Sequence, residues 1–313
     1  MKFARYPVTM RALLGAPGAV ATIGAYDGLH IGHQALLAAT RRAASRHGLP
    51  AVVMSFEPTP KEYFGALNAP ARITRFRERF EWLRDAGLDA FFCPRFGTAM
   101  AGIDVDAFIE QWLVAALGLK HLVVGDDFRF GHQAAGTVED LKQAGRQHGF
   151  EVEEIGSVES AGERVSSTAI RAALAIGDMD TVRRLLGRAY VLGGKVIRGQ
   201  QLGRTLGFPT ANIDLHRRVS PVRGIYAVRI NGIGPSVRDG VASVGTRPTV
   251  NGQGVLLEVF VFDFNGDLYG KRLGVELVAR LRDEEKFDSL EALTEQMARD
   301  ADDARKLLTS VRD

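Results

Sequence analysis

The 313-residue sequence has a single cysteine and no long apolar segment. One cysteine, Cys93, excludes a disulfide framework and a cysteine metal cluster. The longest apolar runs, such as residues 112–119, are far shorter than the roughly 20 residues that a membrane span needs. The first residues carry no long apolar segment typical of a secretory signal. We therefore expect a reduced, cytoplasmic protein with no membrane partner.

A strong excess of one charge is also missing from the chain as a whole, whose net charge is +3. Residues 1–185 carry 21 basic and 21 acidic side chains, whereas residues 186–247 carry 10 basic and 2 acidic ones. The basic region overlaps a cluster of 16 glycines in residues 186–275. This combination favours a compact polyanion such as a nucleotide triphosphate, because nucleic-acid-binding proteins more often use a basic helix or arm. We expect no nucleic-acid partner, although charge alone also allows a set of solvated basic loops.

The first part of the chain alternates between segments typical of buried strands and of amphipathic helices. Such alternation predicts a doubly wound α/β domain, in which helices cover both faces of a parallel sheet. We place this domain at residues 1–187. The expected strands are residues 18–25, 51–56, 88–93, 121–125 and 150–155, and the expected helices are residues 33–47, 74–86, 105–117, 137–148, 168–175 and 179–186.

The pattern then changes to short strands separated by glycine and proline, which predicts a small antiparallel β-barrel at residues 188–313. A stretch from residue 289 to residue 311 has neither glycine nor proline, and its apolar residues recur at helical spacing. We expect it to form a C-terminal helix on the barrel. The expected strands are residues 190–197, 224–231, 240–245, 255–263 and 273–281.

The segment GAYDGLHIGH, residues 24–33, connects the first long strand to a helix. Backbone amides and the helix dipole favour anions at such a place. His30 and His33 could hold the phosphates of a nucleotide there and stabilise charge that develops on them. The alternative is a glycine-rich turn with two surface histidines. Three glycines would let the backbone approach a ligand: Gly24, Gly28 and Gly32.

Two further segments of the first domain carry polar groups at expected strand or helix ends. VSSTAIR, residues 165–171, offers hydroxyl groups that can cap a helix, and its Arg171 could clamp a triphosphate. Taken alone, a simple helix cap is the better interpretation. VGDDFRFGHQAAG, residues 124–136, leaves the end of another strand. Because ligands of open parallel sheets bind at the carboxyl ends of strands, all of these segments could converge.

The basic region contains GGKVIRGQQLGRTLGFPTANIDL, residues 193–215. Thr210 and Asn212 lie two residues apart, on one side of an extended chain. Their oxygens, together with phosphate, would suit Mg²⁺. Taken alone, a β-turn with a Pro-Thr-Ala-Asn cap is the better interpretation. The glycine and basic residues of the segment include Lys195, Arg198, Gly199, Gly203, Arg204 and Gly207.

Glu258 favours the functional interpretation of the second domain. It lies in VLLEVFVFDF with apolar neighbours on both faces of the predicted strand. Burying such a carboxylate costs several kcal/mol unless a charge or hydrogen bond compensates it. We therefore interpret Glu258 as a candidate general base with a raised pKa. The alternative is a structural partner for a nearby arginine.

The N-terminal motifs GAYDGLHIGH, GDDFRFG and VSSTAIR resemble the signatures of the FMN adenylyltransferase module of prokaryotic bifunctional FAD synthetases, which are HxGH nucleotidyltransferases. The family usually has Phe at the position of Tyr26, so the added hydroxyl needs a partner. The resemblance implies catalytic roles for His30, His33 and Arg171, an ATP site that includes Gly24, Tyr26, Asp27, Gly28, Gly32, Ser166, Ser167 and Thr168, and a flavin side at Asp127 and Phe128.

The C-terminal motifs GRTLGFPTAN, SVGTRPT, LEVFVFDF and LRDEEKF resemble riboflavin kinase modules and occur in the same order. The resemblance implies a six-stranded barrel in which Glu258 takes the proton from the ribityl 5′-hydroxyl of riboflavin. It also implies Mg²⁺–ATP at Thr210 and Asn212, further ATP contacts at Gly199, Gly203 and Arg204, and a flavin side at Arg282, Glu284 and Phe287.

Together these resemblances predict a bifunctional enzyme that converts riboflavin to FMN and then FMN to FAD, consuming ATP at each step. We expect a monomer or a weak homo-oligomer with small-molecule substrates. Two other classes stay open: an adenylyltransferase whose barrel only binds flavin or a partner, and a non-catalytic nucleic-acid binder. The second would bind DNA or RNA in a salt-dependent way and consume no ATP.

Overall fold

A computed structural model describes residues 1–199, 203, 206–217, 219–249 and 252–310. The chain forms two compact units, Met1–Ser167 and Thr168–Asp313. Two short helices, α8 (Ser167–Ile176) and α9 (Met179–Leu186), thus fall mainly in the second unit, where Arg183 of α9 pairs with Glu276 at 3.2 Å. The sequence groups both helices with the first domain, and a functional boundary at residues 187/188 stays a prediction.

The first unit is built on a parallel sheet of six strands, as the sequence predicts. Its edge strand β1 was not expected, because its sequence KFA contains no run of apolar residues. The strands follow the order β1 (Lys2–Ala4), β4 (Ala90–Phe92), β3 (Ala51–Met54), β2 (Ala19–Ile23), β5 (Leu119–Gly125) and β6 (Glu151–Ile155). The order reverses between β2 and β5, so the carboxyl ends of these two strands flank a crevice where ligands bind in open α/β sheets.

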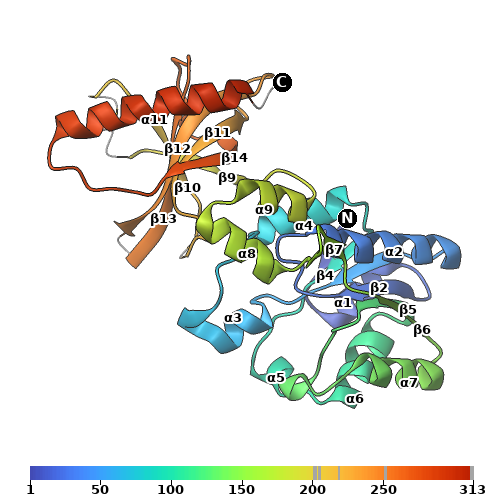
Figure 1. Ribbon diagram of the computed structural model, residues 1–313. Helices are drawn as coiled ribbons and strands as arrows, with labels where there is room; N and C mark the ends of the chain where they lie inside the picture. Colours follow the sequence, from blue (N-terminus) through green and yellow to red (C-terminus); the bar gives the residue numbers. More distant parts are fainter. Residues whose placement is uncertain (200–202, 204–205, 218, 250–251, 311–313) are drawn as a thin grey trace. The chain divides into compact units, whose positions relative to one another are not determined.

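Helices cover both faces of this sheet (Figure 1). One face packs against α2 (Ile31–His47) and α4 (Phe76–Asp85). The other packs against α1 (Pro7–Leu14), α5 (Thr98–Ala101), α6 (Val105–Phe108), the π-helix η2 (Ile109–Ala116) and α7 (Val138–His148). The remaining short elements are α3 (Pro60–Gly65), η1 (Ala66–Asn68), η3 (His132–Ala134), β7 (Glu159–Ser160) and β8 (Glu163–Arg164). The doubly wound prediction is therefore confirmed.

The second unit contains a closed barrel of six antiparallel strands, which confirms the predicted architecture. The strand β10 was missed, because its residues were interpreted as a turn and a cap after Pro209. Around the barrel the order is β10 (Thr210–Asp214), β13 (Gly252–Val261), β12 (Arg238–Thr249), β11 (Gly224–Asn231), β14 (Arg272–Arg282) and β9 (Val191–Ile197).

The glycine-free C-terminal segment forms α11 (Leu290–Ser310), as predicted. The helix lies along the barrel and contacts β11, β12 and β14 (Figure 1). Ala301, Ala304 and Leu308 pack there against Ala227 and Phe262. Among all described helices, none is both long and apolar enough to cross a membrane.

Candidate active sites

The loop between β2 and α2 carries the two predicted histidines. His30 caps α2, because its Nδ1 accepts a hydrogen bond from the backbone N–H of His33 at 3.2 Å. With Nδ1 used as an acceptor, the neutral ring carries its proton on Nε2. The two imidazoles stack with ring centroids 3.6 Å apart and an interplanar angle of 15°. Both histidines therefore lie at the positive end of a 17-residue helix.

Burial of the His33 ring and the neighbouring His30 hold the pKa of His33 well below its usual value. Its Nδ1 is buried and has no hydrogen-bond partner among the described residues. At neutral pH His33 is therefore an uncharged imidazole in the free protein. The ring can donate a hydrogen bond to an anionic ligand through its N–H, but it carries no positive charge of its own. The charge stabilisation expected from the sequence would therefore come from a hydrogen bond.

Asp27 joins three segments around this loop. Its carboxylate accepts hydrogen bonds from the backbone N–H of Ile73 at 3.1 Å and of Thr74 at 2.8 Å. Its backbone carbonyl accepts a bond from the Ser167 hydroxyl at 2.9 Å. The segments GAYDGLHIGH and VSSTAIR thus meet, as predicted from strand ends. The carboxylate itself faces the protein, so Asp27 shapes the loop, and its contact with ATP stays a prediction.

Tyr26, where the related family usually has Phe, is fully buried. Its hydroxyl lies 2.6 Å from the hydroxyl of Thr22, which is the partner that the added hydroxyl needs. Burial raises the pKa of Tyr26, so its hydroxyl stays protonated.

The glycines of the first loop serve different local needs. Gly28 adopts a positive φ of 85°, which a residue with a side chain rarely takes. A Cβ at Gly32 would lie 3.2 Å from Nδ1 of His30, so Gly32 makes room for the capping ring. At Gly24 the nearest atoms belong to the ring of Tyr26. Contacts of these glycines with phosphates stay predictions.

The sequence did not reveal Arg79, which stabilises the loop between β2 and α2. Its guanidinium donates to the carbonyl oxygen of Ala25 at 2.7 Å and to Glu57 at 2.9 Å, although Arg79 is only 3% exposed. Burial lowers the pKa of Arg79. An arginine in the charged helix sequence RFRERF resembles a solvated surface residue, and only the tertiary contacts reveal its position.

The other predicted residues of the first site have varied surroundings. Asp127 forms an ion pair with Arg164, and Phe128 stacks on Phe130 with ring centroids 5.8 Å apart. Arg171 and Thr168 lie on α8 within the second unit. The flavin role of Asp127 and Phe128 and the phosphate role of Thr168, Arg171 and Ser166 stay predictions.

The barrel has a cavity of about 190 Å³ on its outer face. Five residues predicted for the second site line this cavity together: Thr210, Glu258, Arg282, Glu284 and Phe287. They come from β10, β13, the end of β14 and the loop that follows it. Residues far apart in the sequence thus share one pocket. Sequence reasoning missed several other lining residues, among them Phe208, Ser243 and Asp300.

Strand register explains why these residues meet. Asn212 of β10 and Ser243 of β12 both pair with Glu258 of β13. Directly paired residues of antiparallel strands project on the same face, so the three side chains form one row. The Oδ1 atom of Asn212 is buried and has no hydrogen-bond partner in the described part of the chain. A Cβ at Gly199 would lie 2.5 Å from the Asn212 amide, so this glycine permits the close approach.

Glu258 points away from the barrel interior. Its side chain is half-buried and lines the outer cavity, where apolar residues such as Phe260 also lie. The barrel interior is filled by the alternate residues, such as Leu257 and Val259, which are fully buried. The outward face keeps apolar residues too, because the cavity itself needs an apolar lining, and this obscured which face was inside.

Arg282 is fixed by α11, a contact that the sequence did not reveal. Its Nε and Nη2 donate to the two carboxylate oxygens of Asp300 at 2.8 and 2.7 Å. This bidentate pair raises the pKa of Arg282. The same guanidinium lies 5.7 Å from the ring centroid of Phe287. The pair therefore links the cavity wall to the C-terminal helix. Arg204, predicted at the ATP phosphates, lies outside the described residues.

Comparisons with known proteins match this division of the chain. The family model for FAD synthetase matches residues 15–169, and the model for riboflavin kinase matches residues 186–308. A protein of Escherichia coli K12 named bifunctional riboflavin kinase/FMN adenylyltransferase is 45% identical over 289 residues, which cover 92% of each chain. The chain belongs to this bifunctional family. The resemblance drawn from the motifs is thereby confirmed.

Two further proteins are similar over nearly the whole chain. The Haemophilus influenzae protein of the same name is 43% identical over 94% of this chain and 95% of its own. A solved structure from Streptococcus pneumoniae, described as a macrolide-efflux protein, is 32% identical and aligns with a TM-score of 0.80 over 96% of this chain and 97% of that chain. The similarity thus extends over both halves of the sequence.

Proposed function

We propose that the protein phosphorylates riboflavin to FMN in its barrel and transfers AMP from ATP to FMN in its N-terminal unit, which yields FAD and pyrophosphate. Family membership supports both activities. The observation that carries the residue assignment is the outer cavity of the barrel, because it gathers Thr210, Glu258 and Arg282 from separate strands.

In the kinase reaction Glu258 accepts the proton of the ribityl 5′-hydroxyl as that oxygen attacks the γ-phosphorus of ATP. The γ-phosphoryl group moves to riboflavin and ADP leaves. A half-buried carboxylate in an apolar cavity can take this role. Most of the acceleration comes from positioning, as in phosphoryl transfer generally. Arg282, held by Asp300, and Phe287 form the wall that orients the flavin.

Mg²⁺ fits two residues of β10, of which Thr210 lines this cavity. The Oδ1 atom of Asn212 is a buried hard oxygen that has no hydrogen-bond partner among the described residues, and Thr210 lies two residues away on the same face of β10. Gly199 leaves the space that the amide occupies. When bound, Mg²⁺ neutralises charge on the ATP phosphates. We propose that Asn212 and Thr210 hold it, with Gly203 and Arg204 near the same phosphates.

In the adenylyltransferase reaction a phosphate oxygen of FMN attacks the α-phosphorus of ATP. This oxygen is already anionic at neutral pH, so the step needs no general base. His30 and His33 donate hydrogen bonds to the phosphates from the N-terminus of α2, where the dipole adds to their effect. Arg171 and the hydroxyls of Ser166, Ser167 and Thr168 complete the proposed site.

We also propose that the enzyme works in the cytoplasm, because its single cysteine, Cys93, is buried and unpaired, which suits a reducing compartment.

We propose further that the functional boundary lies at residues 187/188 and that the enzyme is a monomer or weak homo-oligomer. Limited proteolysis tests the boundary, and sedimentation tests the oligomeric state. Cleavage only near residue 167, or a stable tetramer, would overturn the corresponding proposal.

One assay tests the proposed function directly. The protein is incubated with riboflavin, ATP and Mg²⁺, and riboflavin, FMN and FAD are separated by chromatography. We expect FMN to appear first and FAD to follow. Conversion of FMN to FAD without any phosphorylation of riboflavin would instead indicate an adenylyltransferase with a binding barrel. Binding of DNA or RNA without ATP consumption would indicate the nucleic-acid binder.

A further inference from the structure

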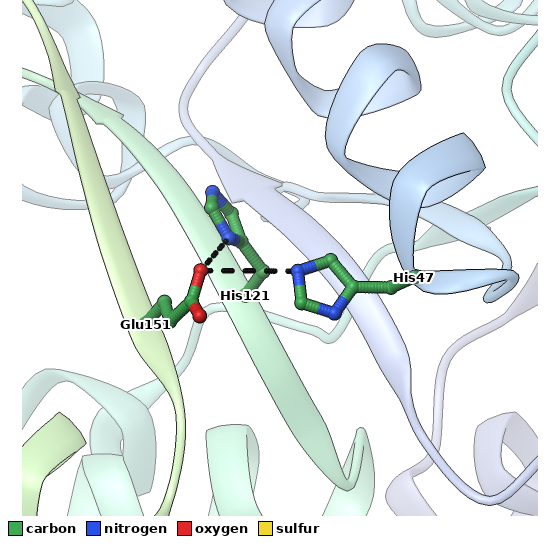
Figure 2. A group of neighbouring side chains, drawn as sticks. All are labelled: His47, His121 and Glu151. Atoms are coloured by element: carbon green, nitrogen blue, oxygen red, sulfur yellow. Dashed lines mark hydrogen bonds and ion pairs between the residues drawn. The ribbon is translucent and has the colours of Figure 1, made fainter.

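A cluster of metal-ligating side chains lies at the opposite end of α2 from the nucleotide loop. His47 is the last residue of α2, His121 lies on β5 and Glu151 is the first residue of β6. Figure 2 shows their side chains turned toward one another. One ligand atom of each lies within 4.8 Å of those of the other two. The 17 residues of α2 span about 25 Å at 1.5 Å per residue, so this cluster is remote from His30.

The distances suit a single ion after small movements. Nδ1 of His121 lies 3.0 Å from Oε2 of Glu151, and Nε2 of His47 lies 3.8 Å from the same oxygen. Ligand atoms about 2.0–2.2 Å from a tetrahedral zinc ion are separated by similar distances. His121 is 4% exposed and fixed by the sheet, whereas the Glu151 side chain is 70% exposed. The carboxylate can therefore adjust, and solvent can reach the centre of the cluster.

A second carboxylate completes the pattern. Nε2 of His121 lies 3.1 Å from Oε2 of Glu153, which in turn pairs with Arg46 at 3.6 Å. Histidine ligands in metal sites almost always donate their other ring N–H to a carboxylate, carbonyl or water, which fixes the tautomer. Glu153 is placed to hold the proton of His121 on Nε2 and so to direct the lone pair of Nδ1 toward Glu151 and His47.

The surroundings of His121 agree with this arrangement. Both of its ring nitrogens face carboxylate oxygens at hydrogen-bond distance, Nδ1 toward Glu151 and Nε2 toward Glu153. A cation on Nδ1 would leave the Nε2–H···Glu153 bond intact.

We propose that Nε2 of His47, Nδ1 of His121 and a carboxylate oxygen of Glu151 bind a divalent transition-metal ion of the zinc class, with water as a further ligand. Two imidazoles and one carboxylate favour zinc over Mg²⁺, which takes mainly oxygen ligands. The ion would connect the end of α2 to the edge of the sheet. Its role is structural, because the nucleotide loop lies at the far end of the helix.

The alternative is an ion-pair cluster that only protects the edge strand β6. Two glutamates on one face of an edge strand discourage pairing with another chain. The metal site predicts that one ion binds to each chain, whereas the ion-pair cluster predicts no stoichiometric metal binding. Chelator-treated full-length protein is titrated with Zn²⁺ by calorimetry in excess Mg²⁺, which occupies sites that prefer oxygen ligands.

We expect wild type to bind one equivalent of Zn²⁺, and the exposed-ligand variants His47→Ala and Glu151→Gln to bind it at least about 10-fold more weakly. Matched controls are His148→Ala, an exposed histidine at the end of α7, and Glu154→Gln, whose side chain pairs with Lys142. Both controls should bind as wild type does. Equal affinity in all five proteins, or no stoichiometric binding by wild type, would overturn the proposal.

A variant of Glu153 tests the role of the carboxylate that orients His121 without binding the metal itself. Glu153→Gln should weaken Zn²⁺ binding roughly 10–100-fold, as loss of such outer partners does elsewhere. Co²⁺ bound in place of Zn²⁺ should give visible absorption bands that disappear in His47→Ala. Conversion of FMN to FAD should stay unchanged in His47→Ala. Intact Co²⁺ bands in that variant would show that His47 is not a ligand and would contradict the proposed site.

Discussion

The two sites of the protein are built in different ways. In the N-terminal unit a loop at the switch point of a parallel sheet leads into the N-terminus of a helix. Hydrogen bonds of the buried Asp27 and Arg79 fix the backbone of that loop. In the barrel the side chains of neighbouring strands form the site directly, because Asn212, Glu258 and Ser243 share one row of the ladder. The first site depends on a supported backbone, whereas the second depends on strand register.

This difference decides how each site should fail. Loss of a single side chain on the barrel row removes one chemical function while the sheet remains. At the loop, side chains and backbone amides act together, so the loss of one side chain should reduce the activity only in part. Substitution of Asp27 or Arg79, which fix the loop, should also lower the activity.

The largest effect is expected for Glu258→Gln. The amide keeps the shape of the side chain but cannot accept the ribityl proton, so phosphorylation of riboflavin should fall by about 10²–10⁴-fold. Conversion of added FMN to FAD should stay at the wild-type rate. Chromatography of the three flavins measures both rates, with Glu291→Gln on the exposed side of α11 as a control. Loss of both activities in the folded variant would contradict separate sites.

The next effect is expected for the double variant His30→Ala, His33→Ala. It removes the cap of α2 and both imidazole donors, so adenylation of FMN should fall by about 10²–10³-fold. The protein should then accumulate FMN from riboflavin. His148→Ala is the matched control. FAD formation at the wild-type rate would show that the histidine pair is not part of the site.

A pair of glycine variants tests the geometry of the barrel row. Gly199→Ala places a Cβ 2.5 Å from the Asn212 amide, whereas Gly193→Ala, on the strand β9 that pairs with β10, meets its nearest atom, the backbone oxygen of Leu273, at 3.6 Å. Displacement of Asn212 by about 1 Å should lower kinase activity by up to about 10²-fold. Gly193→Ala should be nearly normal. Equal kinase rates in the two variants would contradict the proposed role of Asn212.

His33 should make folding sensitive to acid. Its pKa is lowered in the folded state, so the unfolded chain binds a proton that the folded chain excludes. Stability is therefore complete above the usual histidine value and is lost as the pH falls below about 6.5, by at most about 1.4 kcal/mol per pH unit for one proton. Urea unfolding between pH 7.5 and 5 should show a smaller loss in His33→Asn. An identical pH dependence would be incompatible with a buried neutral ring.

The smallest effect concerns Tyr26. Tyr26→Phe leaves the buried Thr22 hydroxyl without its 2.6 Å partner and should lower the free energy of unfolding by about 1 kcal/mol. Thr22→Val in the same protein removes the unsatisfied group and should restore much of that loss. Adenylation should change little. Additive losses in the double variant would show that the two hydroxyls do not interact.

The contrast also explains what the sequence could predict. Alternation with period two and the regular apolar spacing of α11 depend on local residues, so the barrel and its helix were predictable. Parallel strands with a clear apolar run were predictable as well, because such a run is also a local feature. Asp300 and Arg79 were not, because a charged residue on a helix looks solvated until its distant partner is known. The outward position of Glu258 was missed because both faces of β13 are apolar.

Complementation between the two site variants tests the central claim most directly. Glu258→Gln and the double variant His30→Ala, His33→Ala are each incubated with riboflavin, ATP and Mg²⁺, and are then combined in one tube. We predict little or no FAD with either protein alone and FAD in the mixture, because FMN released by one is adenylated by the other. Failure of the mixture to form FAD, although FMN is free in solution and both proteins are folded, would contradict two independent sites on one chain.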